Sequence, residues 1–151
     1  MKTVGIVGGI GPESTVEYHL AIGVNPRYTG EEILRMSEVN LEAKLSKFSE
    51  HWQPRTVSQF NGHDIMVVKA QGEFVWHKHD DTDDFFLVLK GKLTIELRDR
   101  SVHLGPGELF VVPKGVEHRP VANEEVHLLL IEPSGTPNTG DPSTAASRRV
   151  I

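Results

Sequence analysis

Four residues in the second half of the chain have the types and spacing of a metal site: His77, His79, Asp84 and His118. Residues i and i+2 of an extended strand point to the same face, so we expect the imidazoles of His77 and His79 to project together. A turn over residues 80–83 would bring the Asp84 carboxylate beside them, and His118 would supply a third imidazole from a neighbouring strand. Three imidazoles and one carboxylate suit a divalent first-row metal (Mn, Fe, Co, Ni, Cu or Zn) and leave coordination positions for substrate or water.

The other polar residues near these four are interpreted as structural. Asp83 would point to the opposite side of the strand from Asp84, and Asp80 and Asp81 belong to a solvated loop. His127 opens an apolar strand, where packing or a hydrogen bond behind the ligands is its expected role. No residue stands out as a general acid or base, so catalytic residues stay unassigned and no organic cofactor site is predicted.

The segment that carries these residues, 56–132, has the pattern of an antiparallel sandwich or barrel. Short apolar runs are separated by Gly, Pro and Asp at intervals near ten residues. Gly91 lies between two lysines in a tight hairpin, where glycine adopts a positive φ at little cost. The predicted strands lie near 57–60, 63–70, 73–78, 84–90, 92–98, 101–104, 108–112, 117–121 and 126–132.

The segments on either side differ from it in composition and in the spacing of their apolar residues. Within 36–55, Leu41, Leu45, Phe48 and Trp52 form one apolar stripe, which predicts a helix from Ser37, its N-cap, to about Glu50. This helix should pack on the outside of the sheet. Residues 133–151 are rich in Ser, Gly, Thr and Pro with little to bury until Val150, so they are expected to form a tail or surface strap.

Composition narrows the function classes. The chain of 151 residues has 16 Lys and Arg against 21 Asp and Glu, a net charge of −5, and no run of basic residues, so no nucleic-acid or anionic-membrane surface is expected. The five excess negative charges arise within 71–132, beside the proposed cation site. The absence of cysteine excludes disulfides and thiolate metal sites. No apolar stretch is long enough for a membrane span and no signal peptide is evident, so we expect a soluble, cytoplasmic protein.

Two stretches of the sequence resemble the conserved motifs of the cupin superfamily. The first runs from Gly72 through His77, His79 and Asp84 to Gly91, and the second contains Gly107, Pro113-Lys114-Gly115 and His118. The resemblance covers about 56–140 and is closest to small single-domain cupins labelled mannose-6-phosphate-isomerase-like. It implies an all-β jelly-roll β-barrel, preceded here by a short helix and an N-terminal extension. It also implies a homodimer, with a metal held by His77, His79, Asp84 and His118.

Two positions depart from those motifs. The first motif usually has glutamate where this chain has Asp84, so the shorter side chain must approach by about one methylene or bind through water. The second usually ends with Asn where this chain has Ala122, and Asn123 would lie on the opposite face of the strand.

The N-terminal extension, residues 1–35, opens on a glycine-rich stretch, Val4 to Thr15. It lacks the second strand that a dinucleotide-binding unit requires. About 20 residues of it resemble the start of aspartate/glutamate racemases. Those enzymes use a pair of cysteines and this chain has none, so racemase activity is not implied. We interpret the segment as a fused fragment or an upstream extension.

The leading hypothesis is therefore a small cupin that holds a divalent metal and a small polar ligand in its barrel. As an enzyme it would resemble a sugar-phosphate isomerase, with the metal as Lewis acid, or it would be a metal-dependent dioxygenase. The alternative from another class is a non-catalytic binding or sensing module. Whether the protein is an enzyme stays open at this stage.

Overall fold

A computed structural model describes Thr29 and residues 36–151. The predicted N-terminal extension, with its racemase-like opening, lies outside the described residues except for Thr29. The chain divides into two units, Met1–Glu38 and Val39–Ile151. No helix among the described residues combines the length and hydropathy that a membrane crossing requires.

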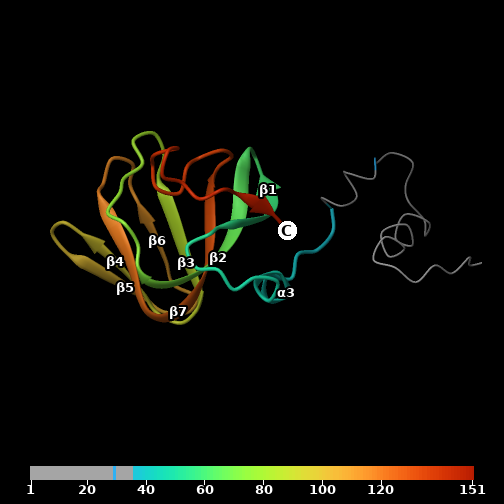
Figure 1. Cartoon of the computed structure of the whole chain (residues 1–151), viewed down its shortest axis with the longest axis horizontal. Helices are drawn as coiled ribbons and strands as arrows, with labels where there is room; N and C mark the ends of the chain where they lie inside the picture. The colour runs from blue at the N-terminus through green and yellow to red at the C-terminus, as the bar shows by residue number, and fades with distance from the viewer. Residues whose placement is uncertain (1–28, 30–35) are drawn as a thin grey trace, which may run out of the picture. The chain divides into compact units, whose positions relative to one another are not determined.

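Eight of the nine described elements of the second unit are strands, which confirms the predicted all-β fold (Figure 1). The described elements are α3 (Leu41–Leu45), β1 (Arg55–Phe60), β2 (His63–Glu73), β3 (Asp84–Lys90), β4 (Leu93–Leu97), β5 (Ser101–Leu104), β6 (Leu109–Val112), β7 (His118–Pro133) and β8 (Arg149–Val150).

The long strand β7 organises the sheet. On one side it pairs with β2 along nearly its whole length, and on the other it pairs with β4 near its start and with β3 near its end. The resulting order is β5-β4-β7-β2-β1-β8, and β3 joins β6 to the second half of β7. β7 thus belongs to both halves of the sheet, which curl around one interior.

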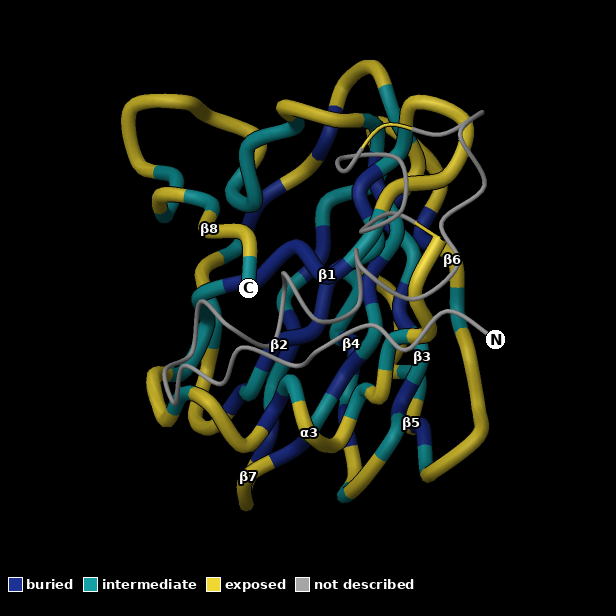
Figure 2. The backbone as a smooth tube through the Cα atoms, turned by 90° about the vertical axis from the view of Figure 1, so that its right-hand side faces the viewer, coloured by how far each residue is buried: buried dark blue, intermediate teal, exposed yellow. Residues whose placement is uncertain are grey.

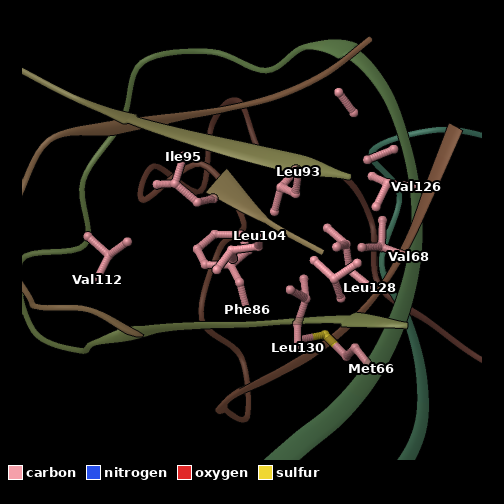
Figure 3. Close-up of a cluster of buried hydrophobic side chains, with 13 residues drawn as sticks. Met66, Val68, Phe86, Leu93, Ile95, Leu104, Val112, Val126, Leu128 and Leu130 are labelled. Carbon is pink, nitrogen blue, oxygen red and sulfur yellow. The ribbon is translucent and has the colours of Figure 1, made fainter. Parts of the chain in front are cut away.

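The interior is filled by alternate residues of each strand. Along β7, His118, Pro120 and Ala122 are buried, and after an exposed interval the same phase resumes at Val126. Buried and partly buried stretches alternate along the strands in Figure 2. The inward apolar side chains form one cluster, in which Phe86, Leu93, Leu128 and Leu130 come from three different strands (Figure 3).

The helix is shorter than predicted. α3 spans Leu41–Leu45, and its N-cap is Asn40 rather than Ser37: Asn40 Oδ1 accepts a hydrogen bond from the Ala43 amide at 2.9 Å. Leu45 packs with Val57 and Val67 in a cluster separate from the barrel interior. Trp52 leaves the predicted stripe because the chain turns at that residue, with φ of 59°, and its ring packs against the interior cluster.

Two strand predictions were wrong. The segment 74–78 is not a strand: β2 ends at Glu73, next to Gly72 with φ of 82° and a register shift against β7. The predicted strands 117–121 and 126–132 are one strand, β7. The polar residues 123–125 suggested a break, but they form an exposed stretch of continuous strand opposite that register shift.

The C-terminal segment is a strap held at several points. Arg148 Nη1 donates to Asp64 Oδ2 at 2.6 Å, and Arg148 Nη2 donates to Glu132 Oε2 at 2.5 Å and to the Thr136 carbonyl oxygen. β8 then pairs with β1. Ile151, rather than the exposed Val150, packs against the cluster around Leu45.

Candidate metal centre

His77 and His118 face each other across an isolated pair of strand-type hydrogen bonds. The amide of His77 donates to the carbonyl oxygen of His118 at 3.0 Å, and the amide of His118 donates back to that of His77 at 2.9 Å. Residues paired in this way project side chains to the same side. The ring centroids are accordingly 4.3 Å apart. His77 therefore reaches the site through a local bridge, although the strand predicted for it is absent.

His79 and Asp84 are placed by the corner at Pro113-Lys114-Gly115. The Gly115 amide donates to the His79 carbonyl oxygen at 2.7 Å. The Lys114 amide donates to Asp83 Oδ1 at 2.9 Å, which anchors the residue before β3. Asp84 begins β3 and points inward in phase with Phe86, so Asp83 and Asp84 take opposite directions.

The four side chains converge on one point. Asp84 Oδ2 lies 3.0 Å from His118 Nε2, 3.4 Å from His79 Nε2 and 3.8 Å from His77 Nε2. One ligand atom from each residue lies within 4.8 Å of all the others, and all four residues are buried. Donor atoms at about 2.0–2.1 Å from a first-row metal are roughly 3.0–3.4 Å apart, so the set has nearly the required spacing.

Backbone contacts fix which ring nitrogen faces the centre. His77 Nδ1–H donates to the Val75 carbonyl oxygen at 2.9 Å, and His118 Nδ1–H donates to that of Val116 at 3.0 Å. With the proton of a neutral ring on Nδ1, each Nε2 carries a lone pair directed at the Asp84 carboxylate. Lone pairs and a carboxylate repel one another at this distance. They can lie together only if positive charge, either a metal ion or additional protons, lies between them. The same outer hydrogen bonds orient histidines that ligate metals.

Two buried atoms at the centre, His79 Nε2 and Asp84 Oδ1, have no hydrogen-bond partner in the part of the chain that the structure describes. Unpartnered polar atoms this deep are costly and rare. A metal ion at this point would coordinate them, so the donor set fits a divalent cation. Burial alone would raise the pKa of Asp84, but interaction with the neighbouring imidazoles of His118, His77 and His79 holds the pKa of that carboxyl well below its usual range. Asp84 is thus available as an ionised ligand.

Comparisons with known proteins agree with this geometry. Residues 64–132 match the cupin domain family. The chain is 33% identical to the uncharacterized protein YdbB of Bacillus subtilis (strain 168) over 81 residues, which cover 53% of this chain and 72% of YdbB. It is 47% identical to a crystallised cupin-2 domain containing protein from Shewanella frigidimarina NCIMB 400, with a TM-score of 0.62 over 63% of this chain and 93% of that one. The chain belongs to the cupin superfamily.

A more distant structural relative is similar to this cupin in fold only. Hydroquinone 1,2-dioxygenase from Sphingomonas sp. TTNP3, crystallised with 4-hydroxybenzoate bound, has a TM-score of 0.58 and 20% identity. The aligned parts are 66% of this chain and 32% of the dioxygenase.

The cupin has a pocket that opens beside the centre. Its empty volume is about 390 Å³, including the part open to solvent. The wall is mainly aromatic and aliphatic, with four polar residues. The lining residues are Trp52, Pro54, Val68, Phe74, His77, Asp84, Phe86, Pro120, Leu128, Leu130, Glu132 and Asn138.

Sequence reasoning missed Glu132, which is buried in this wall with 3% of its surface exposed. Burial, and then repulsion from the Asp84 carboxylate, raises the pKa of Glu132 to about 8, while Arg148 opposes the shift. The signal was present in the sequence, because Glu132 follows Val126, Leu128 and Leu130 at intervals of two and so shares their inward face.

Several other polar residues of the two motif regions lie away from the metal centre. Arg119 pairs with Glu73 and Glu96 on the outside, and His127 Nε2 bonds Glu125 rather than any ligand. Ala122, in place of the motif's Asn, is buried in the apolar cluster, and Asn123 is exposed on the opposite face.

Proposed function

We propose that this cupin binds a divalent first-row metal through His77, His79, Asp84 and His118 and holds a small ligand beside it in the adjoining pocket. The observation that carries the proposal is the pair of buried, unpartnered atoms, His79 Nε2 and Asp84 Oδ1, directed at the same point as two oriented imidazoles. A structural role for these residues would not require donors without partners.

The residues around the centre prepare it for ligand chemistry. The Val75 and Val116 carbonyl oxygens fix the two imidazoles, and the carboxylate of Asp84 supplies the negative charge. The apolar wall restricts water around the bound molecule, which strengthens electrostatic interactions there. When bound, the metal would act as a Lewis acid or, if it is iron, activate oxygen.

Three readings of that chemistry are distinguishable. The likeness to a hydroquinone dioxygenase in fold and the pocket's apolar wall support a dioxygenase. The mannose-6-phosphate-isomerase-like resemblance supports isomerisation of a sugar phosphate or keto compound. A non-catalytic binding or sensing module requires neither oxygen activation nor isomerisation. Oxygen uptake by the iron-loaded protein with phenols and diketones, sugar-phosphate isomerisation, and ligand binding without turnover separate these readings.

Metal content tests the proposal directly. Protein purified without chelator is expected to contain about one equivalent of metal, and a His77→Ala, His118→Ala double variant much less. A matched control is the His63→Ala, His103→Ala double variant, because both of these histidines lie outside the centre. Substoichiometric metal in the wild type after incubation with each candidate metal would refute the proposal, as would equal content in all three proteins.

We also propose a homodimer in which strand β6 takes part. Its outward side chains Leu109 and Val111 are 55% and 38% exposed, and they lie opposite Leu87 and Phe85 of β3. Adjacent exposed apolar side chains are typical of interfaces. Light scattering should give a dimer mass for the wild type and a monomer mass for a Leu109→Glu, Val111→Glu variant, and a monomeric wild type would contradict this.

A further inference from the structure

The composition of the pocket wall restricts the ligand, if the proposed function holds. Among the described residues that line the pocket, eight are apolar and none is Lys or Arg. A phosphate group in a protein site is normally met by cationic side chains or by convergent backbone amides. Pro54 and Pro120, two of the lining residues, lack amide protons altogether.

The charged side chains on the wall are acidic. Asp84 faces the metal centre, whereas Glu132 is directed into the pocket by the same strand phase that buries Leu128 and Leu130. The carboxyl group of Glu132 can accept a hydrogen bond from a ligand in either of its protonation states. Apart from the proposed metal ion, this wall therefore offers a dianionic group no positive charge.

The arginine that contacts Glu132, Arg148, is already engaged. Arg148 donates to Asp64 Oδ2, to Glu132 Oε2 and to the carbonyl oxygen of Thr136. Two carboxylates therefore share its charge, and it is not among the residues that line the pocket. Arg148 acts as a positioning residue: it holds the Glu132 carboxyl in place and contributes no anion site.

We propose that the pocket binds a small, non-phosphorylated molecule with a compact apolar body and a hydroxyl group that donates to Glu132. The apolar body would contact the eight apolar lining residues, and the hydroxyl group would meet the buried Glu132 carboxyl. The inference rests on the proposed function and narrows it, because it excludes sugar phosphates as the ligand class.

Phenol and phenyl phosphate are matched probes, since they share the ring and differ in having a hydroxyl or a phosphate group. The full chain is loaded with Zn²⁺, which has no redox chemistry. A Trp76→Phe background leaves Trp52, at the pocket, as the sole reporter, because the chain has 2 tryptophans. Titration of Trp52 fluorescence should show phenol binding at least 10-fold more tightly than phenyl phosphate.

Two variants test the wall itself. Glu132→Leu removes the hydrogen-bond acceptor and should weaken phenol binding about 10-fold, the factor expected for the loss of one hydrogen bond. Its matched control is Glu117→Leu, at an exposed glutamate that also pairs with an arginine, Arg98, and it should leave binding unchanged. Asn138→Arg, which places a cation on the wall, should strengthen phenyl phosphate binding at least 10-fold relative to phenol. This second variant keeps the test valid if Glu132→Leu does not fold.

The outcomes separate the two proposals. Phenyl phosphate binding as tightly as phenol, no Trp52 response to either probe, or no effect of the wall variants would overturn the ligand class. Zn²⁺ content is measured on the same samples, and failure to take up Zn²⁺ would overturn the proposed function instead. The preference between the probes is read in either case, because the apolar wall and Glu132 belong to the chain and not to the metal.

Discussion

The barrel interior has two ends that follow the same strand periodicity but differ in chemistry. The metal end contains His77, His79, Asp84, His118 and Glu132, and the hairpin end, next to Gly91, contains Val88, Leu93, Leu104 and Val126. Along β3 the inward residues change from Asp84 through Phe86 to Val88.

The difference shows how one fold separates stability from function. Hydrocarbon burial stabilises the hairpin end, whereas each buried ionisable group at the metal end costs free energy unless it is paired. The metal end can therefore keep its unpartnered donors only because the hairpin end supplies the packing. Four predictions test this division, in decreasing order of expected effect.

The largest effect is expected at the hairpin end. Leu93→Ala should lower the free energy of unfolding by about 2–5 kcal/mol, because Leu93 is fully buried and the variant leaves a cavity. Metal content per folded molecule should not change. Urea denaturation measures the first and metal analysis the second, with Val150→Ala on the exposed surface as a control within about 0.5 kcal/mol of wild type. Loss of metal from folded Leu93→Ala would show that the two ends are not separable.

Metal removal should have the next largest effect. At a free metal concentration 100 times the dissociation constant, binding adds about 2.7 kcal/mol to stability, which a chelator would remove. The thermal midpoint of the wild type should therefore fall on chelation. That of His118→Ala should respond little, and an equal response in both proteins would contradict a centre that contains His118.

The third prediction concerns the ion pair that borders the metal end. Burial would raise the pKa of Asp64, but hydrogen bonds from Gln59, Ser134 and Arg148 lower it below its usual value. The ionised form is thus favoured by folding, and its contribution is present above the unfolded pKa of about 3.9 and lost as the pH falls below it. Asp64→Asn should cost about 2 kcal/mol at neutral pH. The difference from wild type should shrink near pH 3 in urea denaturation, and a constant difference would exclude this pair as its source.

The smallest effect is expected outside the barrel. Asn40→Ala removes the N-cap of α3 and should cost about 1 kcal/mol, whereas Asn40→Asp should retain most of the stability. Metal content should be unchanged in both variants. A loss of metal here would show that the metal end depends on the packing of α3.

The parts of the site that the sequence reveals are those with short-range patterns. The spacing of His77, His79 and Asp84, the glycine corners and the cupin motifs predicted the fold and the residues that converge. Glu132 was predictable from its strand phase, but an acidic residue at a strand end also suits a solvated position. Arg148 was not, because its partner Asp64 is 84 residues away and no local pattern specifies such a contact. The spacing of apolar residues placed Trp52 on the predicted helix, but its positive φ turns the chain at this residue, which the spacing does not indicate.

A single strand, β7, begins with His118 and has Glu132 next to its last residue. The pocket residues Pro120, Leu128 and Leu130 lie between them on the same inward face. Its partners at the site, His77 and Asp84, come from earlier in the chain, so the site contains contacts of long sequence separation. Contacts of this kind form only after the entropic cost of closing long loops has been met. We therefore expect the metal centre to assemble after β7 has closed the barrel, so that metal binding marks the completion of folding rather than its nucleation.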